Sequence, residues 1–155
     1  MTIDELKVEL DLNPYATIEV FNSINNAICI RKNRYLFIDD LTGACYLFNK
    51  NGMIDETTKL KIVGQFTFEF NDTLTTIILP DSIEKIEDYA FRNCTSLNRI
   101  EMPDTISCIE PSAFIGCISL KQIVFKNKTM DEIKKIRDFP WERYKSRIIC
   151  KELTN

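Results

Sequence analysis

Residues 81–103 read DSIEKIEDYAFRNCTSLNRIEMP, and residues 104–126 read DTISCIEPSAFIGCISLKQIVFK. The second segment repeats the first at an offset of 23 residues without a gap. Ala90-Phe91 falls on Ala113-Phe114, and Cys94 falls on Cys117. A gap-free match of this length is not expected by chance, so the chain contains internal repeats.

The same apolar skeleton continues 23 residues upstream in a weaker copy, whose members are Leu60, Val63, Phe68, Leu74, Ile77 and Leu79. The period lies inside the range of roughly 20–29 residues that is typical of leucine-rich repeats. One such coil cannot bury its apolar face alone, so stacked coils are needed to form a continuous core. The sequence therefore predicts a short solenoid of about three coils over residues 60–126, with Phe91 stacked on Phe114.

The motif Ile-x-x-Ile-x-x-x-Ala-Phe-x-x-Cys-x-x-Leu-x-x-Ile resembles the BspA-like leucine-rich-repeat family. The residues that carry the resemblance are Ile83, Ile86, Ala90, Phe91, Cys94, Leu97 and Ile100, and then Ile106, Ile109, Ala113, Phe114, Cys117, Leu120 and Ile123. The Ala-Phe and Cys positions separate this class from ordinary leucine-rich repeats. The tail up to Cys150 looks like a closing segment that follows such repeats. The resemblance implies adhesion or interaction through the repeat surface, and no enzymatic activity.

Residues 127–155 are expected to form a C-terminal helix-strand cap. Thr129-Met130-Asp131-Glu132 is a capping-box pattern, which predicts a helix that runs to about Arg137. Ile148-Ile149 predicts a last strand that protects the edge of the sheet. Trp141 is interpreted as the residue that fills the core of this cap, with an exposed anchor for a partner as the alternative.

Residues 1–59 do not show the repeat and are expected to form an N-terminal helix/strand cap or a small α/β subdomain. Asn13-Pro14 begins a predicted helix to about Asn25. Ala27–Ile30, Tyr35–Ile38 and Cys45–Phe48 read as short strands. No linker divides this segment from the repeats, which favours a cap over a separate partner-specific module. The fold class is therefore α+β, a short leucine-rich-repeat solenoid with a cap at each end.

The composition of the 155 residues excludes several kinds of active site. The chain has no histidine, which removes Ser-His-Asp and Cys-His catalysis as well as histidine metal sites. None of the six cysteines forms a Cys-x-x-Cys pair, so we expect buried thiols that act as small apolar groups. There is no run of eighteen apolar residues, so no membrane span is predicted. We predict no catalytic residue, no metal site and no cofactor.

The candidate partner-binding residues are those that alternate with core positions on the main strand of each repeat. They should point outward from the concave face. They are Thr76, Ile78, Arg99, Glu101, Gln122 and Val124. The alternative is that caps and loops cover these six side chains.

Acidic residues offer two further candidate sites. Glu84, Glu87, Asp88 and Glu110 could supply paired carboxylates for a hydrolase. Solvated outer turns are the preferred interpretation of these residues. Asp39-Asp40 could suggest a cation site, but an Asp-rich turn is the simpler interpretation.

Charge along the chain is uneven, because residues 126–155 hold nine basic and five acidic residues while the whole chain has a net charge of −3. A solvated cap explains this tail, with an acidic partner or nucleic acid as the alternative.

Together these features predict a non-catalytic protein-interaction module, for example a small inhibitor or adaptor such as a phage-encoded inhibitor of a bacterial defence enzyme. A secreted or surface adhesin is the alternative, and a carboxylate-dependent hydrolase is the second. The acidic N-terminus lacks a secretory signal, so we expect a cytoplasmic location, or an extracellular one if a signal has been removed.

Overall fold

The chain folds into two compact units, Met1–Lys59 and Leu60–Asn155. A computed structural model describes residues 1–12, 27–31, 34–39, 41–48 and 60–152. The helix predicted from Asn13 to about Asn25 lies outside these described residues.

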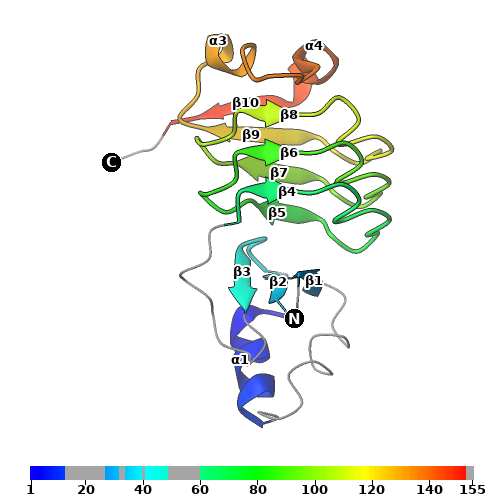
Figure 1. Ribbon diagram of the computed structural model, residues 1–155, viewed down its shortest axis with the longest axis vertical. Helices are drawn as coiled ribbons and strands as arrows, with labels where there is room; N and C mark the ends of the chain where they lie inside the picture. The colour runs from blue at the N-terminus through cyan, green and yellow to red at the C-terminus, as the bar shows by residue number, and fades with distance from the viewer. Residues whose placement is uncertain (13–26, 32–33, 40, 49–59, 153–155) are drawn as a thin grey trace. The chain divides into compact units, whose positions relative to one another are not determined.

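Two parallel sheets run through the second unit and stack its coils one above the next (Figure 1). One sheet has the strand order β4-β6-β8, and the other has the order β10-β9-β7-β5. The strands are β4 (Ile62–Val63), β5 (Thr76–Ile78), β6 (Lys85–Ile86), β7 (Arg99–Met102), β8 (Cys108–Ile109), β9 (Gln122–Lys126) and β10 (Ile148–Lys151). From β4 to β9 the chain alternates between the sheets, so each coil adds one strand to both.

The register of both sheets reproduces the period of the sequence. Thr76 pairs with Arg99 and Arg99 with Gln122 in one sheet, while Lys85 pairs with Cys108 in the other. Equivalent residues of successive repeats therefore lie side by side, and the apolar core positions form ladders.

A ladder of phenylalanine rings forms the centre of this unit. The Phe68 and Phe91 ring centroids lie 4.8 Å apart, and those of Phe91 and Phe114 lie 5.4 Å apart. All three side chains are buried. The predicted stacking of Phe91 on Phe114 in successive coils is confirmed.

The two repeat cysteines bond each coil to the one before it. The thiol of Cys94 donates a hydrogen bond to the carbonyl of Phe68 (3.0 Å), and that of Cys117 donates to the carbonyl of Phe91 (2.9 Å). Its hydrogen bond with Cys117, together with burial, raises the pKa of Cys94 above the usual range of a thiol. The prediction of buried thiols is confirmed for Cys94, Cys108 and Cys117, but Cys45 is only half-buried and Cys150 is exposed on β10. The side chain of Cys29 lies outside the described residues.

The C-terminal segment begins with the capping box that the sequence predicted. The Thr129 hydroxyl accepts from the backbone N–H of Glu132 (3.3 Å), and the Glu132 carboxylate accepts from the backbone N–H of Thr129 (2.7 Å). The helix, α3 (Met130–Ile133), is shorter than predicted and ends before Arg137. The backbone of Arg137 instead bonds to the edge of the last coil, where it pairs with Cys108.

Two other aromatic residues fill the place that was predicted for Trp141. After Phe139, the chain forms α4 (Trp141–Tyr144) and a 3-10 turn (Lys145–Arg147) before it enters β10. Phe139 lies 5.7 Å from the ring of Phe125, and Tyr144 lies 6.1 Å from that of Phe114. Trp141 is only partly buried, because it stands at the start of α4 while Tyr144, three residues later, is buried beside the last coil.

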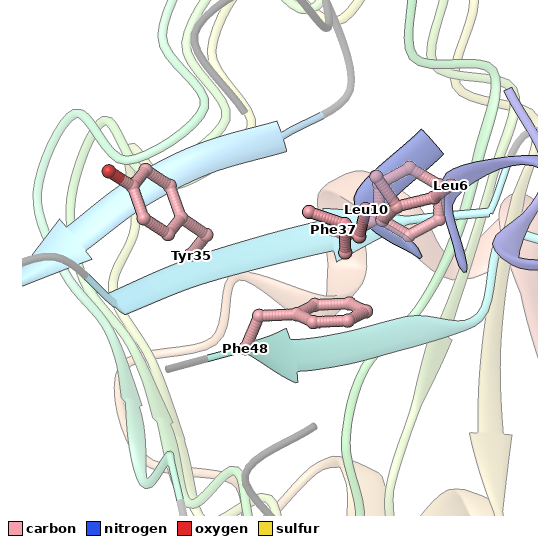
Figure 2. Close-up of a cluster of buried hydrophobic side chains, with 5 residues drawn as sticks. All are labelled: Leu6, Leu10, Tyr35, Phe37 and Phe48. Carbon is pink, nitrogen blue, oxygen red and sulfur yellow. The ribbon is translucent and has the colours of Figure 1, made fainter. Parts of the chain in front are cut away.

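The first unit consists of one helix and an antiparallel sheet. The helix is α1 (Ile3–Leu12), and the strands are β1 (Ala27–Arg31), β2 (Arg34–Ile38) and β3 (Cys45–Phe48), in that order in the sheet. The three predicted strands are confirmed to within one residue at each end. Figure 2 shows Leu6 and Leu10 of α1 beside Phe37 of β2, in a cluster completed by Tyr35 and Phe48.

Helix α1 was not predicted, although its sequence carries the signals. Leu6 and Leu10 are spaced four residues apart and lie on one buried face. Thr2 and Glu5 cap the start of the helix by hydrogen bonds in both directions. No helix in the described parts of the chain is long and apolar enough to cross a membrane.

Candidate functional site

The six predicted partner-binding residues lie together on the outer face of the sheet β5-β7-β9. Register places Thr76, Arg99 and Gln122 in one row and Ile78, Glu101 and Val124 in the next. Glu101 is only 6% exposed and Val124 is fully buried, while the other four side chains are half-buried. The expectation that all six side chains are exposed is therefore wrong for Glu101 and Val124, and partner binding by this face stays a prediction.

Strand β10 explains why these two positions are covered. It pairs with β9 so that Ile149 lies beside Val124, and its Lys151 ammonium reaches the Glu101 carboxylate (3.3 Å). Arg99 pairs with the same carboxylate (3.2 Å) and donates to the side-chain carbonyl of Gln122 (2.7 Å). The polar groups of this face thus already bind one another.

The charge state of Glu101 follows from these neighbours. Burial raises the pKa of its carboxyl group, but the hydrogen bonds from Arg99 and Lys151 outweigh burial and hold the pKa below its usual range. A partner that docked on this sheet face would have to break an ion-pair network that is complete within the chain.

A second surface carries the most exposed apolar side chains of the repeats. We call it the turn edge, and it comprises residues 64–75, 87–98 and 110–121, which lead from one sheet to the other. Figure 1 shows these segments as loops stacked along one side of the unit. Phe66 is 50% exposed, Phe70 62% and Ile118 82%, and Ile115 is also exposed.

The aromatic residues of the turn edge are organised around one arginine. The rings of Phe66 and Tyr89 are parallel, with centroids 5.6 Å apart. The guanidinium carbon of Arg92 lies 5.7 Å from the ring centre of Phe70 and 5.7 Å from that of Tyr89. These distances fit cation–π contacts. Arg92 also pairs with Glu69 at 3.2 Å, so the cluster is held in one arrangement.

The backbone of these turns enters the left-handed region at defined repeat positions. Phe66 and Tyr89, which are 23 residues apart, both have φ of 62°. The next such position holds Phe70 (φ 60°), Asn93 (φ 57°) and Gly116 (φ 77°) in successive coils. Gly and Asn adopt this region readily, whereas other residues lose roughly 1–2 kcal/mol there. Sequence reasoning missed this surface, although the 23-residue alignment already places Phe66 over Tyr89.

The four candidate carboxylates are used to join coils. Glu87 accepts from the backbone of Gln65 (3.0 Å), Glu110 from that of Asp88 (2.7 Å), and Asp88 from that of Ser112 (2.7 Å). Glu84 pairs with Lys61 at 3.3 Å, and Lys85 lies 2.7 Å from Glu110.

The charge state of Glu110 is unsuited to acid catalysis. Its hydrogen bond from Lys85, followed by that from Asp88, lowers the pKa of Glu110. A general acid needs the opposite shift, so Glu110 does not suit that role.

Asp39 stabilises a turn, which confirms the interpretation of this segment as an Asp-rich turn. Its buried carboxylate accepts from the backbone N–H groups of Ile3 (2.6 Å), Leu41 (2.9 Å) and Thr42 (2.8 Å). Burial raises the pKa of Asp39, and these hydrogen bonds outweigh burial and lower it. Within the described residues no cluster of three His, Cys, Asp or Glu side chains could hold a metal ion, and Asp40 lies outside them.

Two basic residues of the C-terminal segment lie over aromatic rings of α4. Lys134 lies over the ring of Trp141 at 5.0 Å, and Arg147 lies over that of Tyr144 at 5.7 Å. Lys145 and Arg143 face solvent.

Comparison with known proteins identifies the repeat. The family model of the BspA type leucine rich repeat region matches residues 46–140 in six copies. None of the curated proteins matches the chain. The fold is thus a leucine-rich-repeat fold with mixed strands and few helices.

Two solved bacterial structures are similar to parts of the chain. One is a leucine rich cell surface protein from Faecalibacterium prausnitzii A2-165, with 28% identity over 50% of this chain and 20% of that chain, and a TM-score of 0.49. The other is a leucine-rich repeat protein from Bacteroides ovatus ATCC 8483, with 18% identity over 72% of this chain and 33% of that chain, and a TM-score of 0.42. The present chain thus matches a fifth and a third of their lengths.

Proposed function

The chain belongs to the BspA-type leucine-rich-repeat family, and on this premise we propose that it is a non-catalytic protein-binding module that acts as an adaptor or inhibitor of its partner. Repeats of this kind present a rigid surface for interaction. In this proposal the coils between Leu60 and Lys126, three in number, form the rigid body. Residues 1–59 and 127–155 act as its caps.

The exposed apolar turn edge is the observation that carries this proposal. Burial of a large apolar side chain against a partner contributes about 1.5–3 kcal/mol, and Phe66, Phe70 and Ile118 are half or more exposed. Aromatic and arginine side chains are also the residue types that dominate binding energy in protein interfaces. The Arg92 cluster supplies both, whereas the sheet face offers polar groups that are already paired.

We also propose a cytoplasmic location, which the chemistry of the cysteines supports. Cys94 and Cys117 are thiols that donate hydrogen bonds to the backbone, and Cys150 is an exposed free thiol. Free thiols persist in reducing compartments. Fractionation of the cells that encode the chain, followed by immunoblotting, tests this location, and recovery in the secreted or surface fraction would refute it.

A pull-down with matched variants tests the proposed function. The tagged chain is incubated with lysate of the cells that encode it, and bound proteins are identified by mass spectrometry. The turn-edge variant is Phe66→Asn/Ile118→Ser, and the sheet-face variant is the charge swap Arg99→Glu/Glu101→Arg. We expect one stoichiometric protein partner that the sheet-face variant retains and the turn-edge variant loses.

The other outcomes are equally decisive once circular dichroism shows that both variants fold. Loss of the partner in the charge-swap variant alone would move the interface to the sheet face. Recovery of no protein, or of nucleic acid only, would refute a protein-binding module.

A further inference from the structure

Phe66 and Phe70 both combine two disfavoured properties on the turn edge, but the next coil again holds an aromatic residue, Tyr89, at the position of Phe66, whereas it holds Asn93 at the position of Phe70. The backbone φ of Phe70 is 60°, in the left-handed region, and its side chain is 62% exposed. A large apolar residue in that conformation is a genuine outlier. Outliers of this kind gather at sites where a protein meets its ligand.

The equivalent residues of the next two coils show that the fold does not need an aromatic ring there. Asn93 and Gly116 occupy the position, and both residue types adopt positive φ readily. The position is also crowded further along the ladder, because a Cβ on Gly116 would lie 1.9 Å from Oδ1 of Asn93. Small residues therefore suit the stack, and Phe70 is the exception.

The surroundings of Phe70 hold its ring in place. Arg92 from the next coil lies over the ring at 5.7 Å and pairs with Glu69, the residue that precedes Phe70. A ring that is fixed before binding loses little conformational freedom when it enters a partner.

The charge of the turn edge indicates which class of partner can bind there. Its three segments contain the acids Glu69, Asp72, Glu87, Asp88 and Glu110 but only the bases Arg92 and Lys121. Lys85, at the border of the edge, pairs with Glu87 and Glu110, and Arg92 pairs with Glu69, so the edge keeps a small excess of acidic groups. An acidic surface repels the phosphates of nucleic acids and of anionic membranes, and it attracts basic side chains.

Building on the proposed function, we propose that Phe70 is an anchor that inserts into an apolar pocket of a folded partner protein, and that basic side chains border this pocket. The turn edge consists of loops that lie along one side of the strands (Figure 1). Arg92 acts as a positioning residue that holds the ring ready. The acids of the edge face the basic border of the pocket.

Replacement of Phe70 by the residue of the next coil is the direct test. The variant is Phe70→Asn, and the matched control is Leu41→Asn, which removes a still more exposed apolar side chain from the other unit. The partner recovered by the wild-type chain is purified, and its affinity for each variant is measured by calorimetry. We expect at least a roughly tenfold loss of affinity for Phe70→Asn and less than about a twofold change for Leu41→Asn. Raising the salt concentration should weaken the wild-type complex several-fold.

Two further measurements separate an anchor from a structural residue. Urea unfolding of Phe70→Asn should show unchanged or greater stability, because relief of the backbone conformation offsets loss of the Arg92 contact. A variant with p-benzoylphenylalanine in place of Phe70 should cross-link on irradiation to one site of the partner, with apolar residues flanked by Lys or Arg.

Several results would contradict the proposal that Phe70 is an anchor. Unchanged affinity of Phe70→Asn for a partner that the wild type binds would refute it and leave the proposed function standing. A loss of more than about tenfold in the folding equilibrium would assign Phe70 to the core instead. Cross-links within the chain, to a second copy or to nucleic acid would assign the edge another occupant. If the wild type recovers no partner, the proposed function fails, and the anchor with it.

Discussion

The same coils contain a ladder of phenylalanine rings in the interior and, on the turn edge, a row of residues with left-handed backbone conformation, which we call the left-handed ladder. The two ladders differ in which residue types they accept. Inside, successive coils keep the same residue, at Phe68, Phe91 and Phe114, and the rings stack. Two residues further along each of these coils, on the edge, lie Phe70, Asn93 and Gly116.

This difference shows which positions are restricted in residue type by folding and which are open to selection for binding. An interior position touches the equivalent position of both neighbouring coils, so a change in one ring alters the packing of the others. An edge position also touches a neighbouring coil, as Phe70 touches Arg92 and Gly116 lies against Asn93, but it is partly exposed to solvent, so residue type varies more there. A costly residue on the edge, such as Phe70, thus points to a role outside the fold.

The largest loss of stability is expected for Phe91→Ala, which removes the middle ring of the phenylalanine ladder. We expect a loss of about 3–5 kcal/mol in the free energy of unfolding, because a buried cavity opens between two rings. Urea denaturation monitored by circular dichroism measures it. Phe66→Ala, which truncates an exposed ring of the edge, is the control and should lose about 1 kcal/mol or less. Equal losses for the two variants would abolish the distinction between interior and edge.

An intermediate effect is expected for Gly116→Ala, which tests the left-handed ladder itself. The added Cβ would meet Asn93, and a φ of 77° is unfavourable for alanine, so we expect a loss of about 2 kcal/mol. The double variant Gly116→Ala/Asn93→Gly should recover the steric part of this loss, as a thermodynamic cycle of thermal melts would show. Strict additivity of the two changes would mean that these positions do not touch.

The smallest effect is expected at the covered sheet face and depends on pH. The pKa of Glu101 is lower in the folded chain, so its stabilising contribution is present above the unfolded value of about 4.3 and is lost as pH falls through the folded pKa. Glu101→Gln should therefore cost about 1 kcal/mol at pH 7, and this difference should shrink in acid. Chemical denaturation between pH 7 and pH 3 measures it, with substitution of the exposed Glu142 by Gln (Glu142→Gln) as the matched control. A stability difference that stays constant with pH would show that the ion pairs of Glu101 do not stabilise the fold.

The sequence predicted the coils well, because an offset of 23 residues carries both the core positions and the register. The single pattern that places Phe91 over Phe114 also places Arg99 beside Gln122. Local signals likewise predicted the strands of the first unit and the capping box at Thr129.

What the sequence did not predict depends on contacts outside the repeat. The burial of Glu101 and Val124 requires β10, whose pairing of Ile148 with Ile123 does not follow the repeat offset. The exposure of Phe70 depends on backbone conformation, which apolar spacing does not report. Helix α1 was missed because Leu6 and Leu10 gain their burial from the sheet, in a segment rich in charge.

The constant register of the two sheets has a consequence for how such a chain changes over evolutionary time. A duplication or deletion of 23 codons anywhere within the repeats would leave every interior neighbour as it was, because each residue already lies beside its equivalent. Length is therefore inherited as whole coils, and the C-terminal segment would move as one block with the last of them. Each new copy would also bring a fresh set of edge residues under separate selection, so the recognition surface can diversify while the core stays unchanged.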